Sequence, residues 1–130
     1  MTQEEHINYW LESAWHDYEV SESLFKSGKY DWCLFITHLV LEKTLKAVFV
    51  KNNQNKIPPK IHNLVRLAEL SLLNLNEKQR IFLDEVNDFN LEVRYPEYKE
   101  EFYKNYSKEI AEKYLLESKE FVEWLKFQLK

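Results

Sequence analysis

The segment from Leu34 to Val50 is apolar over most of its length, and its ionisable residues are regularly spaced. His38, Glu42 and Lys46 occur at every fourth position, so in a helix they form one polar stripe. A helix that is apolar on its remaining faces is stable when other elements surround it. The segment therefore predicts a central helix whose polar stripe needs partners from elsewhere in the chain.

Glycine and proline are scarce, with one glycine and three prolines among 130 residues. This leaves little material for hairpin turns or for glycine-rich phosphate-binding loops. Leu, Lys and Glu dominate, as they do in helices, and no alternating pattern is long enough to predict a sheet. We expect an all-α fold, an antiparallel bundle of about five helices, as a single domain over residues 1–130.

Helix-end signals locate the first half of the bundle. Apolar residues at helical spacing predict a first helix at residues 4–27, and Gly28 supplies a left-handed stop after it. A second helix is expected at residues 30–53, followed by a loop at residues 54–60 that contains Pro58 and Pro59.

The second half shows similar signals. A short third helix is expected near residues 64–71, and Asn76 with Gln79 forms a capping box at the start of a fourth. Pro96 disfavours helix just before it, and Ser107 is the expected N-cap of the last helix.

The formal net charge of −4 argues against a general nucleic-acid coating protein, but the charges are unevenly distributed. Residues 43–66 hold six basic and no acidic residues, whereas residues 84–101 hold seven acidic residues and two basic ones. The basic segment is expected either to guide phosphates or to be a solvated surface.

Cysteine and histidine usage limits the possible chemistry. The single cysteine, Cys33, excludes an intramolecular disulfide and is expected to be a packed thiol. The four histidines lack close metal-ligand spacing, so we predict no metal and no cofactor. The sequence has neither a signal-like amino terminus nor a membrane-length apolar run, which predicts a soluble cytoplasmic protein.

Several short motifs, in order, resemble those of the HEPN domain family: Trp15-His-Asp-Tyr18, Ser27-Gly-Lys-Tyr-Asp31, His38-Leu-Val-Leu-Glu-Lys-Thr-Leu-Lys-Ala47, Ile61-His-Asn-Leu64 and Arg94-Tyr-Pro-Glu97. The resemblance covers nearly the whole chain. It implies a small helical bundle that commonly forms a homodimer. It also implies a role like that of the many prokaryotic members that form toxin and antitoxin pairs with a minimal nucleotidyltransferase.

Many members of this family are metal-independent ribonucleases, in which an arginine is followed after four to six residues by a histidine. Counted from Arg94, the corresponding positions hold Lys99, Glu100 and Glu101, and no histidine follows His62. The family's adenylylation motif, with a tyrosine two residues past that histidine, is also broken, because Glu101 stands there. Ribonuclease activity of the usual type is therefore not expected, and whether the protein is an enzyme stays open.

We expect the ligand-binding residues to be Arg94 and Tyr95 together with His38, Glu42 and Lys46. In this interpretation Arg94 binds a phosphate and Tyr95 stacks on a base. The alternative is purely structural, with a buried Glu42–Arg94 ion pair and a core hydrogen bond from His38.

These residues predict nucleotide or RNA binding, and the resemblance implies that the protein acts in partnership with a minimal nucleotidyltransferase. One alternative is an active ribonuclease with a displaced base such as His38, and another is a non-catalytic protein-interaction module. His62 and Asn63 are expected to cap the third helix or to bind the loop backbone. The tryptophans are expected to be core or dimer-interface anchors.

Overall fold

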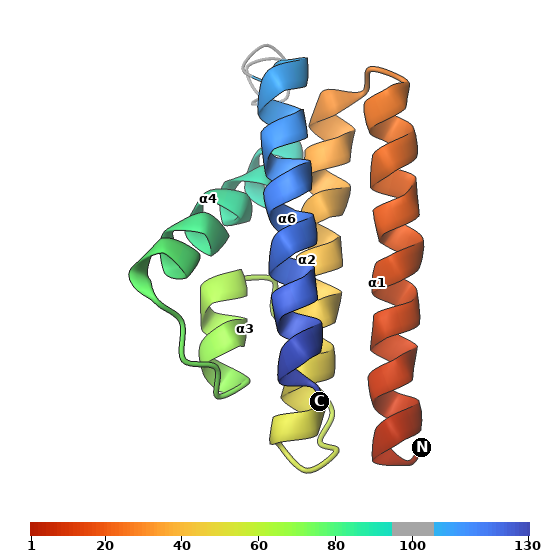
Figure 1. Ribbon diagram of the computed structural model, residues 1–130, viewed down its shortest axis with the longest axis vertical. Helices are drawn as coiled ribbons and strands as arrows, with labels where there is room; N and C mark the ends of the chain where they lie inside the picture. The colour runs from red at the N-terminus through yellow and green to blue at the C-terminus, as the bar shows by residue number, and fades with distance from the viewer. Residues whose placement is uncertain (95–105) are drawn as a thin grey trace.

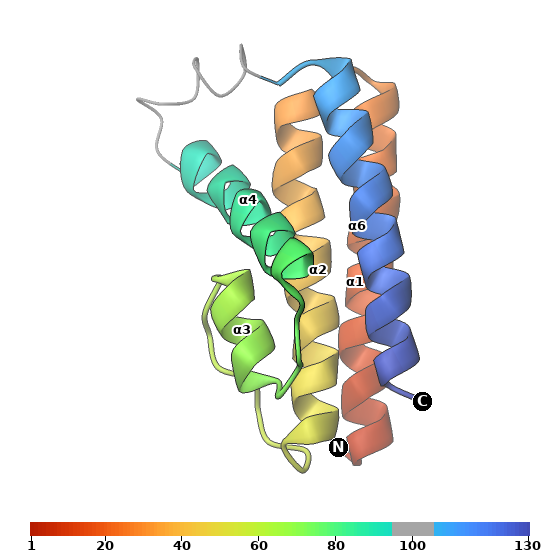
Figure 2. The same ribbon diagram turned by 60° about the vertical axis from the view of Figure 1, so that its left-hand side comes forward.

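Three long helices stand side by side, and two others cover the remaining side of the middle one (Figures 1 and 2). The computed structural model describes residues 1–94 and 106–130, with only the backbone described at residues 91–94. The helices are α1 (Gln3–Lys26), α2 (Tyr30–Asn52), α3 (Leu64–Leu70), α4 (Glu77–Arg94) and α6 (Lys108–Gln128). No strand occurs in these two ranges, which confirms the expected all-α bundle of five helices.

The turn between α1 and α2 has the left-handed stop predicted from Gly28. Gly28 has a φ of 76°, a conformation that glycine adopts without a Cβ penalty. Its N–H donates to the carbonyl of Phe25 at 3.1 Å, and the N–H of Lys29 donates to that of Leu24 at 2.9 Å. These two bonds form a Schellman motif, which satisfies the last carbonyls of α1 and reverses the chain.

The later helices begin at their predicted caps. Asn76 and Gln79 exchange hydrogen bonds of 3.0 and 2.7 Å, the two arms of a capping box at the start of α4. The hydroxyl of Ser107 accepts from the N–H of Ile110 at 3.3 Å, as expected of the N-cap of α6.

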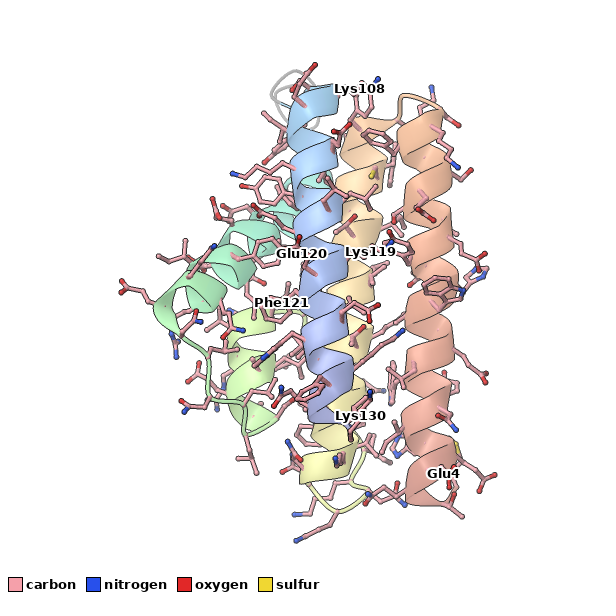
Figure 3. The ribbon with its side chains drawn as sticks, in the orientation of Figure 1. Glu4, Lys108, Lys119, Glu120, Phe121 and Lys130 are labelled. Carbon is pink, nitrogen blue, oxygen red and sulfur yellow. The ribbon has the colours of Figure 1, made fainter. Side chains whose placement is uncertain are left out.

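α2 lies at the centre of the bundle and packs against each of the other four helices. Most of its side chains are buried, and its two buried threonine hydroxyls, of Thr37 and Thr44, donate to carbonyls one turn earlier. Phe121 of α6 lies on the side that faces α4, where its ring stacks on that of Phe82 at 5.6 Å (Figure 3). The expected central helix is therefore present.

Cys33 is fully buried, and this burial raises the pKa of its thiol to about 11. The expectation of a packed thiol is confirmed. Within residues 1–94 and 106–130, no helix is both long enough and apolar enough to span a membrane.

Two of the four tryptophans lie at the surface. Trp15 is 54% exposed and Trp32 is 38% exposed, so these two are not core anchors, whereas Trp124 packs against the core. The ring of Trp15 stacks on that of Tyr18 at 5.5 Å, and the ring of Trp32 makes an edge contact with Phe35 at 5.9 Å. Their role as dimer-interface anchors stays a prediction.

Removal of one core side chain from α2 tests how strongly the fold depends on this helix. Leu45→Ala should lower the free energy of unfolding by about 2–5 kcal/mol, because Leu45 is fully buried and the truncation leaves a cavity. Urea denaturation followed by circular dichroism measures the change. Leu116→Ala is the control, since Leu116 is exposed on α6, and it should change stability by less than ~0.5 kcal/mol. Equal effects of the two variants would contradict a core centred on α2.

Candidate functional site

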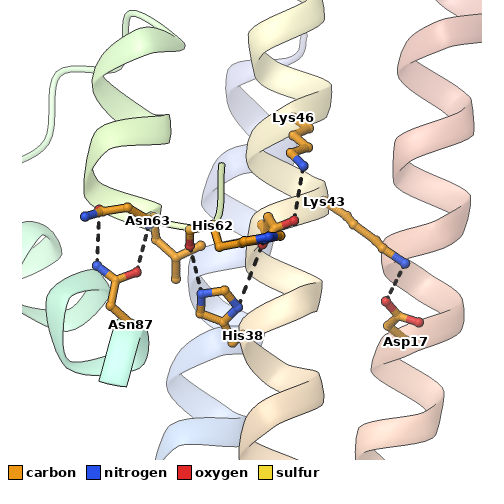
Figure 4. A network of polar contacts seen from close by, with 9 residues as sticks. Asp17, His38, Lys43, Lys46, His62, Asn63 and Asn87 are labelled. Atoms are coloured by element: carbon orange, nitrogen blue, oxygen red, sulfur yellow. Dashed lines mark hydrogen bonds and ion pairs between the residues drawn. The ribbon is translucent and has the colours of Figure 1, made fainter. Parts of the chain in front are cut away.

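The buried residue Glu42 is the centre of a polar network on α2, and its partners His38, Lys46 and His62 are labelled in Figure 4. The residue is 5% exposed, and its two carboxylate oxygens have different partners. Oε2 accepts from Nζ of Lys46 at 3.1 Å, and Oε1 accepts from Nδ1 of His62 at 2.8 Å. Nδ1 of His38 lies 3.9 Å from Oε1. The carboxylate is therefore satisfied on both oxygens, which is what a buried charge requires.

His38 binds the backbone of the loop between α2 and α3. Its Nε2 lies 2.9 Å from the carbonyl oxygen of His62. Because a carbonyl can only accept, Nε2 of His38 carries the proton in this bond. The side chain is 1% exposed, so its ring is enclosed by the bundle. The expected core hydrogen bond of His38 is thus present, and its partner is the loop.

The imidazole of His62 is much more accessible than that of His38. Its side chain is 45% exposed, although Nδ1 points at the buried carboxylate of Glu42. When an ionised carboxylate accepts this bond, Nδ1 carries the proton and Nε2 of the neutral ring is an acceptor. The arrangement holds an exposed ring in one orientation and one tautomer.

Lys46 forms the end of the polar stripe that is directed toward α1. Its ammonium group binds Glu42 and also lies 5.3 Å from the centre of the Trp10 ring. The residue is 7% exposed. A cation in this position is stabilised by the carboxylate and by the ring face, so the stripe extends from α1 to the loop before α3.

Two asparagines connect that loop to α4. Asn63 is the N-cap of α3, where its side chain accepts from the N–H of Arg66 at 3.1 Å. Asn87 of α4 accepts from the N–H of Leu64 at 2.8 Å and donates to the side chain of Asn63 at 3.2 Å. The loop segment around His62 is therefore fixed from α2 on one side and from α4 on the other.

Asn90 is a buried polar residue of α4 that the sequence reasoning missed. It is 5% exposed and lies one helical turn before Arg94. No hydrogen-bond donor to its Oδ1 is present among the side chains and backbone that the structure describes. A buried amide oxygen without a donor costs about 1–3 kcal/mol, so this atom is a candidate contact for a ligand.

A further part of α4 is acidic. Burial raises the pKa of Asp88, and the neighbouring carboxylates of Asp84 and Glu85 raise it further. Burial also raises the pKa of Tyr114 to about 12, with a contribution from its hydrogen bond to Glu85 at 3.1 Å. These carboxylates disfavour an anionic ligand on this part of the α4 surface.

The structure brings three of the predicted site residues together. His38, Glu42 and Lys46 form one connected group, as their spacing predicted. Arg94 is the last residue of α4, but its side chain and Tyr95 lie outside the described residues, so their part in the site stays a prediction.

His62 has a different role from the expected one. Asn63 alone is the cap of α3, and the side chain of His62 turns back to Glu42. The sequence carries no signal for this contact, because an irregular loop separates the two residues. Among the described residues, no three His, Cys, Asp or Glu side chains are arranged to hold a metal ion.

Comparison with known proteins gives the family of this chain. The chain is similar to the crystal structure of TT1696 from Thermus thermophilus, with a TM-score of 0.79 and 18% sequence identity over 95% of this chain and 98% of that one. Curated proteins gave no significant match. The sequence profile of the HEPN domain matches residues 7–128, nearly the whole length. This protein therefore belongs to the HEPN domain family.

Proposed function

We propose that this protein is a cytoplasmic homodimer that binds a nucleotide or RNA near the end of α4 and acts with a minimal nucleotidyltransferase as a toxin and antitoxin pair. Membership of the HEPN domain family supports a nucleotide- or RNA-related module. In this proposal Arg94 binds a phosphate, Tyr95 stacks on a base, and the α2 network of His38, Glu42 and Lys46 forms the floor of the site.

The observation that carries the proposal is the buried amide oxygen of Asn90, which has no donor among the described residues. α2 places Glu42 in the bundle interior, and α4 places Asn90 there, one turn from Arg94. An exocyclic amino group of a base is a suitable donor to the amide oxygen of Asn90. A buried amide oxygen is costly unless it is paired, so its position one helical turn before Arg94 supports a ligand there.

The two alternatives receive less support. His38 is a poor choice for a displaced ribonuclease base, because its ring is enclosed and its Nε2–H is bonded to a backbone carbonyl. A non-catalytic interaction module accounts for the Glu42 network, whose carboxylate is satisfied within the chain, but it gives no role to the buried oxygen of Asn90.

Replacement of the predicted phosphate ligand tests the site. Arg94→Ala should weaken the binding of ATP or of a short single-stranded RNA by about tenfold or more, because a hydrogen bond to a charged group contributes ~1.5–3 kcal/mol. Isothermal titration calorimetry measures the affinity, and circular dichroism checks the helical content. Arg80→Ala is the matched control, since Arg80 is a half-exposed arginine near the other end of α4. An affinity unchanged by Arg94→Ala would remove Arg94 from the site.

Asn90 allows a test that separates binding from stability. Asn90→Leu should weaken binding of the same RNA, yet it should leave the thermal midpoint unchanged or higher, because an unpaired buried amide is replaced by an apolar side chain of similar size. Asn87→Ala should instead lower the midpoint, since Asn87 holds the loop before α3. Full affinity in Asn90→Leu would exclude this residue from ligand contact.

The oligomeric state is a separate part of the proposal. Multi-angle light scattering on the purified protein should give twice the mass of the 15.9 kDa chain. Dilution or added salt then measures how strongly the two copies associate. A mass of one chain at all concentrations would contradict the homodimer.

A further inference from the structure

An open groove runs between α4 and α6. Both helices pack on α2, but along their described lengths their backbones do not pack against each other. Aromatic rings bridge them instead, because the ring centres of Phe82 and Phe121 lie 5.6 Å apart and those of Phe82 and Tyr114 lie 6.2 Å apart. Outside these rings the groove has a volume of about 720 Å³, which is within the range of protein binding pockets.

The groove has an apolar floor and an acidic rim. Phe82 and Phe121 form the floor, with the partly buried Trp124 and with Ile81, which is 53% exposed. The rim consists of four glutamates and two lysines: Glu77, Glu85, Glu117, Glu120, Lys78 and Lys113. Figure 3 shows Glu120 and Phe121 on the side of α6 that faces α4. An exposed apolar patch surrounded by polar residues is typical of a surface that binds another molecule.

The acidic rim carries charge that the described residues do not neutralise. No lysine, arginine or histidine among them forms an ion pair with Glu77, Glu117 or Glu120. Glu85 accepts a hydrogen bond from Oη of Tyr114 at 3.1 Å, which leaves the negative charge of this carboxylate in place. Burial raises the pKa of Tyr114 to about 12, and Glu85 and Glu117 contribute to the increase. Carboxylates from both helices therefore act on the same part of the groove, which favours a cationic partner.

We propose that this groove binds a basic amphipathic helix of a protein partner. Apolar residues of the partner helix pack on the floor, and its lysine or arginine residues pair with the rim. The inference is independent of the proposed nucleotide binding, because it uses the first half of α4, whereas that proposal places its site near Arg94 at the other end of the helix.

The walls of the groove favour a helix over an extended peptide. The backbone groups of α4 and α6 are bonded within each helix, so the walls offer no edge to which a strand can add. The partner segment must therefore satisfy its own backbone hydrogen bonds, as a helix does. From Lys113 to Trp124 the α6 wall extends for ~16 Å, or about three helical turns. A matching partner helix has apolar anchors at positions i, i+4 and i+7.

Other kinds of molecule match only part of this surface. A polyamine neutralises the acidic rim but has too little apolar surface to cover the floor. An uncharged apolar peptide covers the floor but removes water from the carboxylates without pairing them, which is unfavourable. A helix that is apolar on one face and cationic along its borders matches both parts.

The test uses the full chain and a synthetic peptide of leucine and lysine, about 14 residues long, or ~21 Å as a helix. Its leucines are spaced so that they form one face. In nitrogen-15 NMR spectra this peptide should shift the indole N–H resonance of Trp124, which Trp124→Phe assigns, and the backbone resonances of Ile81 and Glu120. A peptide of the same composition in shuffled order, without an apolar face, should bind about tenfold more weakly or less, because fewer of its leucines reach the floor.

Reversal of charge at the rim tests the electrostatic part. The double variant Glu117→Lys with Glu120→Lys should bind the leucine and lysine peptide about tenfold more weakly or less, because like charges then face each other. Glu12→Lys with Glu19→Lys is the matched control at two exposed glutamates of α1, and it should retain nearly the native affinity. Fluorescence anisotropy of the labelled peptide measures the affinity, and circular dichroism checks the helical content.

A separate variant tests the apolar floor. Ile81→Ser should weaken binding of the peptide about threefold or more, because less apolar surface is then covered. Ile57→Ser is the matched control, since Ile57 is 82% exposed in the loop between α2 and α3, and it should leave the affinity unchanged.

Four outcomes would overturn the inference. The peptide leaves the resonances of α4 and α6 unshifted, or it binds the native protein and the rim double variant equally. Spermidine binds this groove as tightly as the peptide, which assigns the groove to a small cation. The rim double variant has half the native mass in light scattering, which assigns the groove to a contact between copies of this chain. Binding of ATP or RNA is measured separately, so its failure would overturn the proposed function and leave this inference in place.

Discussion

The burial of α2 is the constraint on which the other helices depend. Each of them packs against it, and its apolar side chains are removed from water on nearly every side. A carboxylate in such a helix is tolerated because Lys46 and His62 occupy its two oxygens. Removal of one partner would leave an uncompensated buried charge, so the network and the packing of α2 stabilise each other.

The loop between α2 and α3 has no regular secondary structure, but hydrogen bonds to neighbouring elements hold it in place. Side chains at the end of α2 donate to the end of α3, from Asn52 to the carbonyl of Ser71 at 2.9 Å and from Asn53 to that of Leu70 at 3.1 Å. His6 of α1 contacts Asn55 at 2.9 Å. With the bond from His38, these contacts hold the loop at several points, which gives exposed residues on it a defined position.

The helix ends could be predicted from the sequence because their signals are local. Gly28, the Asn76–Gln79 pair and Ser107 each act within a few residues of the helix that they end or begin, and the expected bounds agree with the structure to within two residues. The stripe of His38, Glu42 and Lys46 was predictable for the same reason, since it depends on helical period alone.

The partner of Glu42 was not predictable in this way. His62 is 20 residues from Glu42, and the irregular loop between them has no period that gives its direction. Pro58 and Pro59 predict that the second helix ends before them, but they do not predict which part of the bundle the chain contacts after the loop. Charge alone suggested Arg94 as a partner, and its side chain lies outside the described residues, whereas the path of the loop places His62 beside the acid. Tertiary contacts across irregular segments require the structure.

The glycine turn after α1 also has a consequence for how the chain assembles. Three residues separate α1 from α2, so these helices meet through contacts that are close in sequence. α6 reaches α2 only after α3, α4 and the segments between them, which is a much longer loop to close. Because the entropy of loop closure grows with length, pairing of α1 with α2 is the less costly first step of folding. The central helix then acquires one covered face during synthesis, before its remaining partners emerge.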